Sequence, residues 1–156
     1  MNFSFAADRS LGKLAKWLRI LGFDTIYESD VSGRWFYDHL GQERILLTRT
    51  EKIRRQCSAQ KLVFIKANDL IEQLRQVIDE LAITRDDIRA FSMCIQCNCP
   101  LMDISKETIY GLVPDYIWEI HHEFHICRQC ERIYWPGSHI ERSREVIEQL
   151  FDKDKV

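Results

Sequence analysis

Four cysteines lie in two pairs, Cys94 with Cys97 and Cys127 with Cys130, and each pair has the spacing Cys-x-x-Cys. This spacing lets both thiolates of a pair turn toward one point. Two such pairs supply four sulfurs, which complete the ligand set of a tetrahedral structural Zn²⁺ site. The sequence therefore predicts a structural zinc ion held by these four residues.

Two alternatives to this ligand set stay open. A redox Cys-x-x-Cys motif has the same spacing, although it usually begins a helix after a strand and needs only one pair. Cys99 lies two residues after Cys97 and is a second candidate partner for the first pair. Three histidines before the second pair are able to replace a thiolate, namely His121, His122 and His125.

Acids and hydroxyls follow four short apolar segments in the N-terminal half. Oxygen ligands of this kind suit Mg²⁺ or Mn²⁺, and two such ions can activate water against a phosphodiester. The alternative is a helix cap, because Ser, Thr, Asn and Asp are common N-caps. Both roles stay open for Asp8, whereas Asn68 and Asp69 are interpreted as caps. The full set is Asp8, then Glu28, Ser29 and Asp30, then Thr48 to Glu51, then Asn68 and Asp69.

Strand and helix patterns alternate over the first 85 residues. This alternation predicts an α/β domain with a parallel sheet flanked by helices. Ligands of such sheets bind beyond the carboxyl ends of the strands, so the acids are expected to gather there. Strands are predicted over residues 2–7, 24–29, 44–49 and 61–67, and helices over 11–21, 33–40, 51–58 and 68–81.

The composition changes near residue 85. A charged connector, residues 83–91, leads into the cysteine pairs, and a helix is predicted over 138–151. We expect an α/β domain of residues 1–85 and a zinc ribbon with a C-terminal helix over residues 90–156. A bound metal would explain how a segment with few large apolar runs holds together.

The bulk composition limits the class of protein. The chain has 156 residues, 46% of them hydrophobic, and a net charge of -2, so it can bury a core but has no overall basic field. No apolar run approaches the roughly 18 residues of a membrane span, and the N-terminus lacks a signal-peptide pattern. A cytoplasmic protein without a membrane segment is expected. The sequence predicts no particular protein partner.

Basic and aromatic residues form two further patterns. Arg9, Lys13, Lys16 and Arg19 recur on one side of the helix expected over 11–21. Around the second cysteine pair cations alternate with rings, a pattern that suits single-stranded nucleic acid. The alternatives are a solvated helix face and, for Trp135, packing in a core. The predicted RNA-binding residues are Lys13, Lys16, Arg128, Arg132, Trp135 and His139.

Four segments together resemble the Mut7-C family, a PIN-like RNase domain with a C-terminal zinc ribbon. They are DRSLGKLAKWLRILGFDT (8–25), RILLTR (44–49), CIQCN (94–98) and CRQCERIYWPGSH (127–139). They occur in the family's order and span nearly the whole chain. The resemblance implies a PIN-like fold, RNA as the substrate or partner, and catalytic Mg²⁺ or Mn²⁺ beside the structural zinc.

The resemblance also implies roles for individual residues. Asp8 matches the aspartate that ends the family's first strand, and Asp30 matches the acid after the second strand. Thr48 is expected to orient water or phosphate. The cysteine pairs and the segment that contains His139 match directly.

The chain departs from the family at the end of the third strand. The family typically has LLTRD there, and this chain has Thr50 in place of the aspartate. A threonine hydroxyl is neutral and is a weak metal ligand. Glu51 is the expected replacement, with Asp38 as a second candidate, although a shift of one residue at a strand end re-aims a side chain.

Two functions are therefore carried forward. The first is a metal-dependent endoribonuclease that uses Asp8, Asp30, Thr48 and Glu51. The second is a catalytically impaired protein that binds RNA or a protein partner without cleaving.

Overall fold

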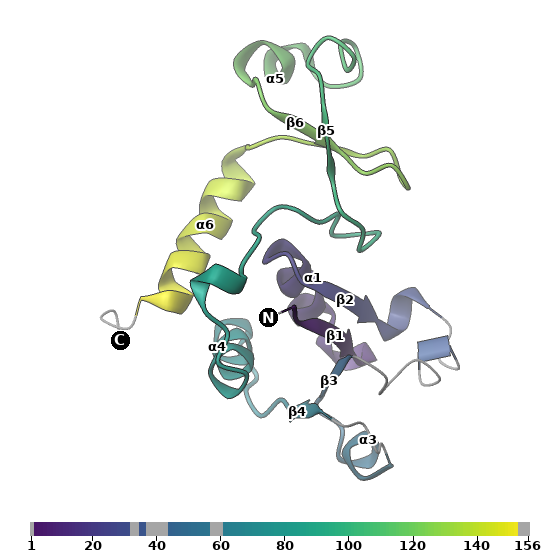
Figure 1. The fold of residues 1–156 in the computed structure, drawn as a ribbon, viewed down its shortest axis with the longest axis vertical. Coiled ribbons are helices and arrows are strands. Elements are labelled where there is room, and N and C mark those ends of the chain that lie inside the picture. Colours follow the sequence, from purple (N-terminus) through teal and green to yellow (C-terminus); the bar gives the residue numbers. More distant parts are fainter. Residues whose placement is uncertain (1, 32–34, 37–43, 57–60, 153–156) are drawn as a thin grey trace. The chain divides into compact units, whose positions relative to one another are not determined.

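The computed structural model describes residues 2–31, 35–36, 44–56 and 61–152. The chain divides into two compact units, Met1–Asn98 and Cys99–Val156. Of the helix expected over 33–40, only Trp35 and Phe36 are described, and Asp38 lies outside the described residues. Figure 1 shows the helices and strands of both units.

The first unit is built on a parallel sheet, as the strand–helix alternation predicted. Its strands are β1 (Ser4–Ala7), β2 (Asp24–Tyr27), β3 (Ile45–Thr48) and β4 (Leu62–Phe64), in the order β2-β1-β3-β4. The chain leaves β1 toward one edge and leaves β3 toward the other. The point where the connections diverge therefore lies between β1 and β3, which is where open α/β sheets bind ligands.

Helices flank this sheet. Helix α1 (Gly12–Ile20) buries Leu14 and Leu18 and contacts β1, β2 and α4 (Leu70–Glu80). Asp69 is the N-cap of α4, because its carboxylate accepts the backbone N–H of Glu72. Shorter helical segments are η1 (Arg9–Leu11), η2 (Glu28–Asp30), α3 (Glu51–Gln56) and η3 (Arg85–Asp87).

One apolar row crosses the sheet in register. Ala6 pairs with Ile26 on one side and with Leu46 on the other, and Leu46 pairs with Leu62. Phe36, Val31 and Ile53 pack against this row. Side chains alternate between faces along a strand, so the residues two positions further on, at the strand ends, point to the same face.

The second unit contains a small antiparallel sheet. Its strands are β5 (Met102–Ile104), β6 (Phe124–Ile126) and β7 (Ile133–Tyr134), in the order β5-β6-β7. Between β5 and β6 lies helix α5 (Asp115–Ile120), and the unit ends in helix α6 (Ser138–Phe151) as predicted. The core beneath α5 is formed by Ile109, Val113, Ile117 and Phe124.

No helix of the described residues is both long and apolar enough to cross a membrane.

Gly22 lies in the turn that follows the end of α1. Its φ of +95° is a conformation that side chains disfavour, and an added Cβ would stand 2.3 Å from the Arg89 carbonyl oxygen. Gly111 has a similar φ of +82°, but an added Cβ there meets nothing within 4 Å.

We predict that Gly22→Ala destabilises the first unit by more than about 2 kcal/mol, because backbone must shift. Gly111→Ala is the matched control and should cost only about 1 kcal/mol in the second unit, the price of the backbone conformation. Hydrogen–deuterium exchange read by mass spectrometry reports each unit separately. Equal losses for the two variants would contradict the steric argument.

Candidate metal centre and strand-end site

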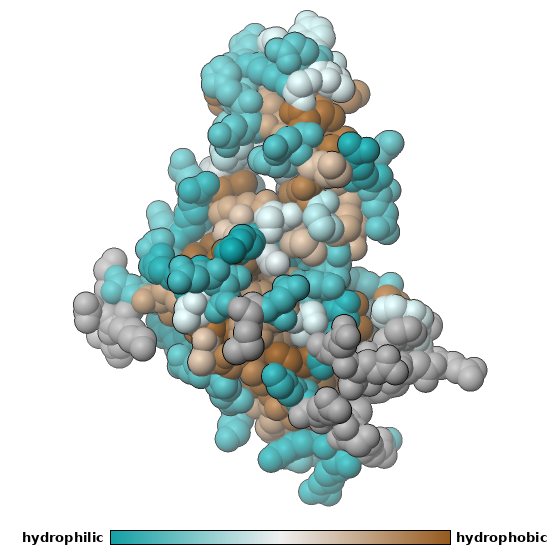
Figure 2. All heavy atoms as spheres, in the orientation of Figure 1, coloured by the Kyte–Doolittle hydropathy of each residue, from teal (hydrophilic) through white to brown (hydrophobic). Residues whose placement is uncertain are grey.

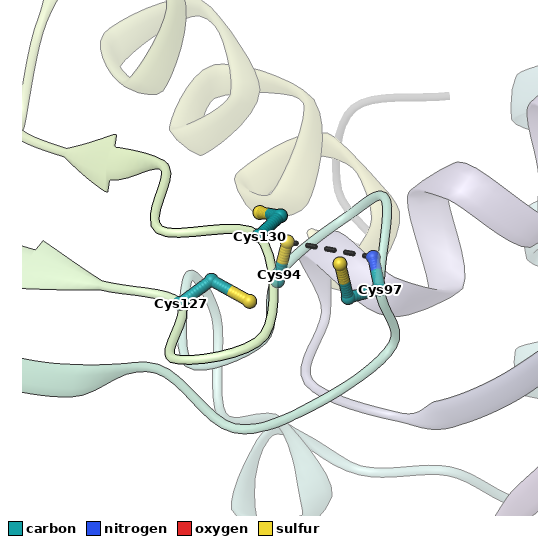
Figure 3. Close-up of side chains that lie close together, drawn as sticks. All are labelled: Cys94, Cys97, Cys127 and Cys130. Atoms are coloured by element: carbon teal, nitrogen blue, oxygen red, sulfur yellow. Dashed lines mark hydrogen bonds between the residues drawn. The ribbon is translucent and has the colours of Figure 1, made fainter.

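Four cysteines converge on one point. The sulfur atoms of Cys94, Cys97, Cys127 and Cys130 all lie within 4.8 Å of one another, and Figure 3 shows the four side chains together. Sulfurs around a tetrahedral Zn²⁺ with bonds of about 2.3 Å stand about 3.8 Å apart. The donor set therefore fits a closed site of a zinc ribbon and can hold a metal ion. The four cysteines that converge are those that the spacing predicted to do so.

The two cysteine pairs have the same local backbone. In each, the residue after the second cysteine donates its N–H to the carbonyl of the first, Asn98 to Cys94 at 2.9 Å and Glu131 to Cys127 at 2.7 Å. Asn98 and Glu131 both have positive φ, 55° and 61°. The shared turn aims backbone N–H groups at the first sulfur of each pair, as the Cys97 N–H does at Cys94. The two halves of the cysteine cluster are therefore built on the same turn.

Cys99 lies beside this cluster. Its sulfur is 3.2 Å from that of Cys127. Burial by itself raises the pKa of the Cys127 thiol, but hydrogen bonds from the backbone of Cys130 and Gln129 and from the thiols of Cys99 and Cys130 outweigh it and lower this pKa to about 6. Cys99 thus acts here as a neighbour that stabilises a ligand thiolate.

The strand ends carry a second cluster, arranged by register. Ala7 pairs with Tyr27 and with Leu47, so the next residues, Asp8, Glu28 and Thr48, form one row across β2, β1 and β3. All three side chains are buried, with Asp8 only 1% exposed. The row lies at the switch point between β1 and β3.

The Asp8 carboxylate accepts four hydrogen bonds. One oxygen accepts from the Ser10 N–H at 2.9 Å and the Ser10 hydroxyl at 2.5 Å. The other accepts from the Thr48 hydroxyl and from the Arg49 N–H at 3.4 Å. These donors are neutral, so they hold the carboxylate in place without cancelling its charge. Asp8 therefore has two roles: it is the N-cap of η1, and it is the central residue of the row.

Glu28 is the nearest described acid to Asp8 in the register. Its carboxylate accepts the Arg9 N–H at 2.8 Å, and the side chain is 9% exposed. The sequence placed Glu28 among the strand-end acids but did not select it as catalytic. The signal that selects it is the pairing of β1 with β2, which no local pattern reveals.

Asp30 forms an ion pair with a buried arginine. Its carboxylate lies 3.1 Å from a guanidinium nitrogen of Arg19. Arg19 was expected on the basic side of α1, but the structure buries it, so that expectation was wrong. Its guanidinium donates to the Thr25 carbonyl at 3.0 Å and, at 2.7 Å, to the carbonyl of Ile95 in the first cysteine turn.

Thr50 and Glu51 stand at the start of α3. The Thr50 N–H donates to the Thr48 hydroxyl at 3.0 Å, and the Thr50 carbonyl accepts from Arg54. Glu51 is exposed, and its carboxylate lies 3.3 Å from the guanidinium of Arg54. Within the described residues, the four cysteines are the one group of three or more potential ligands that lie close enough to hold a metal ion. The strand-end acids do not form a second such group.

The predicted RNA-binding residues divide by exposure. Lys13 and Lys16 are exposed on α1, and Arg128, Arg132 and His139 are exposed in the second unit. Trp135 is partly buried against the core of the second unit, with its ring 6.5 Å from that of Phe124.

The family model described as the Mut7-C RNAse domain matches residues 3–147. The chain belongs to the Mut7-C family. A comparison with curated proteins and another with solved structures found no match. The Mut7-C match includes both clusters, since it begins before Asp8 and ends after Cys130. As an RNase domain family, Mut7-C suggests RNA as the substrate or partner.

We predict one bound metal ion per chain of this Mut7-C protein, lost in Cys94→Ser because a hydroxyl is a poor replacement for a thiolate. Cys99→Ser is the matched control and should keep the metal. Elemental analysis of the purified variants measures both. Loss of metal from Cys99→Ser with retention in Cys94→Ser would contradict the assigned ligands.

We also predict that Arg19→Gln destabilises the first unit by about 3 kcal/mol, because buried carbonyls and the Asp30 carboxylate lose their donor. Arg75→Gln is the control and should cost less than about 0.5 kcal/mol, since Arg75 makes an exposed pair with Glu72 at three-residue spacing. Urea unfolding curves of the two variants provide the comparison. Similar losses would show that Arg19 is not a central contact.

Proposed function

We propose that this Mut7-C protein is a metal-dependent ribonuclease whose site is the row Glu28–Asp8–Thr48. The observation that carries the proposal is the position of Asp8. It is a buried carboxylate at the carboxyl end of a central strand, at the switch point of an open parallel sheet. Membership of an RNase family supplies the reaction class.

The row supplies the groups that such a reaction needs. Mg²⁺ is commonly bound by one or two carboxylates together with substrate phosphate oxygens and water, and Asp8 and Glu28 are such a pair. When bound, Mg²⁺ or Mn²⁺ supplies activated water and neutralises phosphate charge. Thr48 holds the Asp8 carboxylate in its orientation through a hydrogen bond. Asp30 and Glu51 stay proposed contributors that must leave their arginine partners to take part.

The proposed contacts to RNA are made by residues outside this row. Lys13 and Lys16 are proposed to bind phosphates near the strand ends, because they are exposed on the helix that follows Asp8. Arg128, Arg132 and His139 are the proposed contacts of the second unit. Trp135 is a proposed contact as well, although it is partly buried against the core of the second unit. The ion in the four-cysteine site is proposed to be structural Zn²⁺, in a protein of the cytoplasm.

A second candidate is a protein that binds RNA without cleaving it. Two observations favour it. Thr50 stands where the family typically has an aspartate, and the four hydrogen bonds to Asp8 occupy the roughly four acceptor sites of a carboxylate. An ion can then bind Asp8 only by displacing a donor.

We predict that the chain cleaves single-stranded RNA in the presence of Mn²⁺, and that Asp8→Asn and Glu28→Gln each lower the rate by about 100-fold or more, since each removes a charged ligand. Glu72→Gln, on the exposed surface of α4, is the control and should leave the rate unchanged. Gel analysis of an end-labelled RNA pool measures the cleavage.

The Thr50→Asp variant separates the two candidates. An inactive native protein that gains cleavage with Thr50→Asp, and still binds RNA, would establish the second candidate. An active native protein whose rate is the same in Asp8→Asn would overturn the assignment of the site.

A further inference from the structure

Apolar side chains are exposed on one segment of the second unit. Within the described residues, six large hydrophobic side chains are exposed, and four of them lie between residues 110 and 120. They are Tyr110, Leu112, Tyr116 and Ile120, with exposed fractions of 68%, 68%, 65% and 64%. We call these four residues the tip surface. Exposed apolar groups gathered in this way commonly mark an interaction site.

The fold explains why these four side chains point outward. Ile109, Val113 and Ile117 alternate with them and fill the core of the second unit. On α5, Tyr116 and Ile120 are four residues apart and share one side of the helix, while Ile117 lies on the buried side. The side chains of this segment that face the core are therefore Ile109, Val113 and Ile117. The four residues of the tip surface are apolar side chains that the core does not need.

A ring contact holds part of the tip surface rigid. The ring of Tyr110 meets that of Trp118 edge-on at 5.0 Å, and the Trp118 ring N–H donates to the Lys106 carbonyl at 2.8 Å. The Lys106 ammonium lies over the Trp118 ring, 4.5 Å from its centroid. Pre-ordered aromatic side chains lose little conformational entropy on binding.

The charge around the tip surface is negative. Residues 105–123 contain four carboxylates and one lysine, and the lysine is the one engaged by Trp118. All four carboxylates are exposed, namely Glu107, Asp115, Glu119 and Glu123. An RNA phosphate backbone would be repelled there, as would the same surface of a second copy. A segment that carries lysines or arginines would be attracted.

The tip surface lies away from the cysteine turn of its own unit. Strand β6 begins at Phe124, directly after residues 105–123, and ends at Ile126, directly before Cys127. The two features therefore lie at opposite ends of the small sheet, as Figure 1 shows for α5 and the far end of β6. In the corresponding part of Figure 2, brown side chains reach the surface beside teal ones.

We propose that the tip surface docks a basic amphipathic segment of a partner protein. The apolar side of that segment covers Tyr116, Ile120 and their neighbours, and its lysines or arginines face the four carboxylates. The tip surface shares no residue with the cysteine site or with the strand-end row, so RNA cleavage should not depend on it.

The probe for the test is a synthetic helical peptide of leucines and lysines arranged to give one apolar and one basic side. We expect titration calorimetry of the full chain to show binding that weakens as salt is added, because the charges are exposed. The double variant Tyr116→Ser/Ile120→Ser should weaken it by about 10-fold or more, since anchors of this kind dominate binding. Glu107→Gln/Glu119→Gln should weaken it as well.

Two controls make the result specific. Glu141→Gln/Glu145→Gln removes two exposed carboxylates from α6 of the same unit and should leave binding unchanged. A peptide of the same composition in scrambled order should bind weakly. Metal content and hydrogen exchange confirm that each variant is folded.

Absence of binding, or equal binding by the tip variants and the α6 variant, would overturn the proposal. Two other results would also overturn it. In one, the native protein binds single-stranded RNA and the Tyr116→Ser/Ile120→Ser variant does not; in the other, the native protein binds a second copy of itself and the variant does not.

Discussion

The first unit depends on one buried guanidinium. Arg19 donates from α1 to the carbonyl of Thr25 in β2, to the carboxylate of Asp30 after β2, and to the carbonyl of Ile95 in the first cysteine turn. Without this residue, three oxygens from distant parts of the sequence would lose their shared donor. A buried charge is tolerated only when its hydrogen bonds are satisfied, so Arg19 fixes these segments relative to one another within the unit.

A second set of contacts supports the same turn. Asn98, which follows the first cysteine pair, accepts the Thr25 N–H at 2.9 Å and donates to the Asp24 carboxylate at 2.7 Å. Burial raises the pKa of Asp24, but Arg44 and Asn98 outweigh it, and the net pKa is lowered. The first half of the metal site is thereby shaped by β2 as well as by its own short turn. Metal ligands held in place before the ion binds lose less entropy on binding.

The strand-end row is organised around the buried carboxylate of Asp8. The Thr48 hydroxyl donates to this carboxylate, and Glu28 follows the residue of β2 that pairs with Ala7. Thr50, directly before α3, donates its backbone N–H to the same hydroxyl. This contact uses the backbone of Thr50, so it does not depend on which side chain stands at that position.

The sequence by itself predicted the four cysteines that converge, the parallel sheet and the C-terminal helix, because short spacings and hydrophobic periods encode local structure. It also placed Asp8 at the end of a strand, where the structure has it. Only the tertiary structure placed Glu28 beside Asp8, since strand register depends on packing across the sheet. Only the tertiary structure shows that Arg19 is buried. Lys16, three residues earlier on the same side of α1, is exposed, so helical spacing does not distinguish the two. A charged side chain can be buried when carbonyls and a carboxylate from other parts of the chain accept its hydrogen bonds. No single segment of the sequence indicates that these groups will meet.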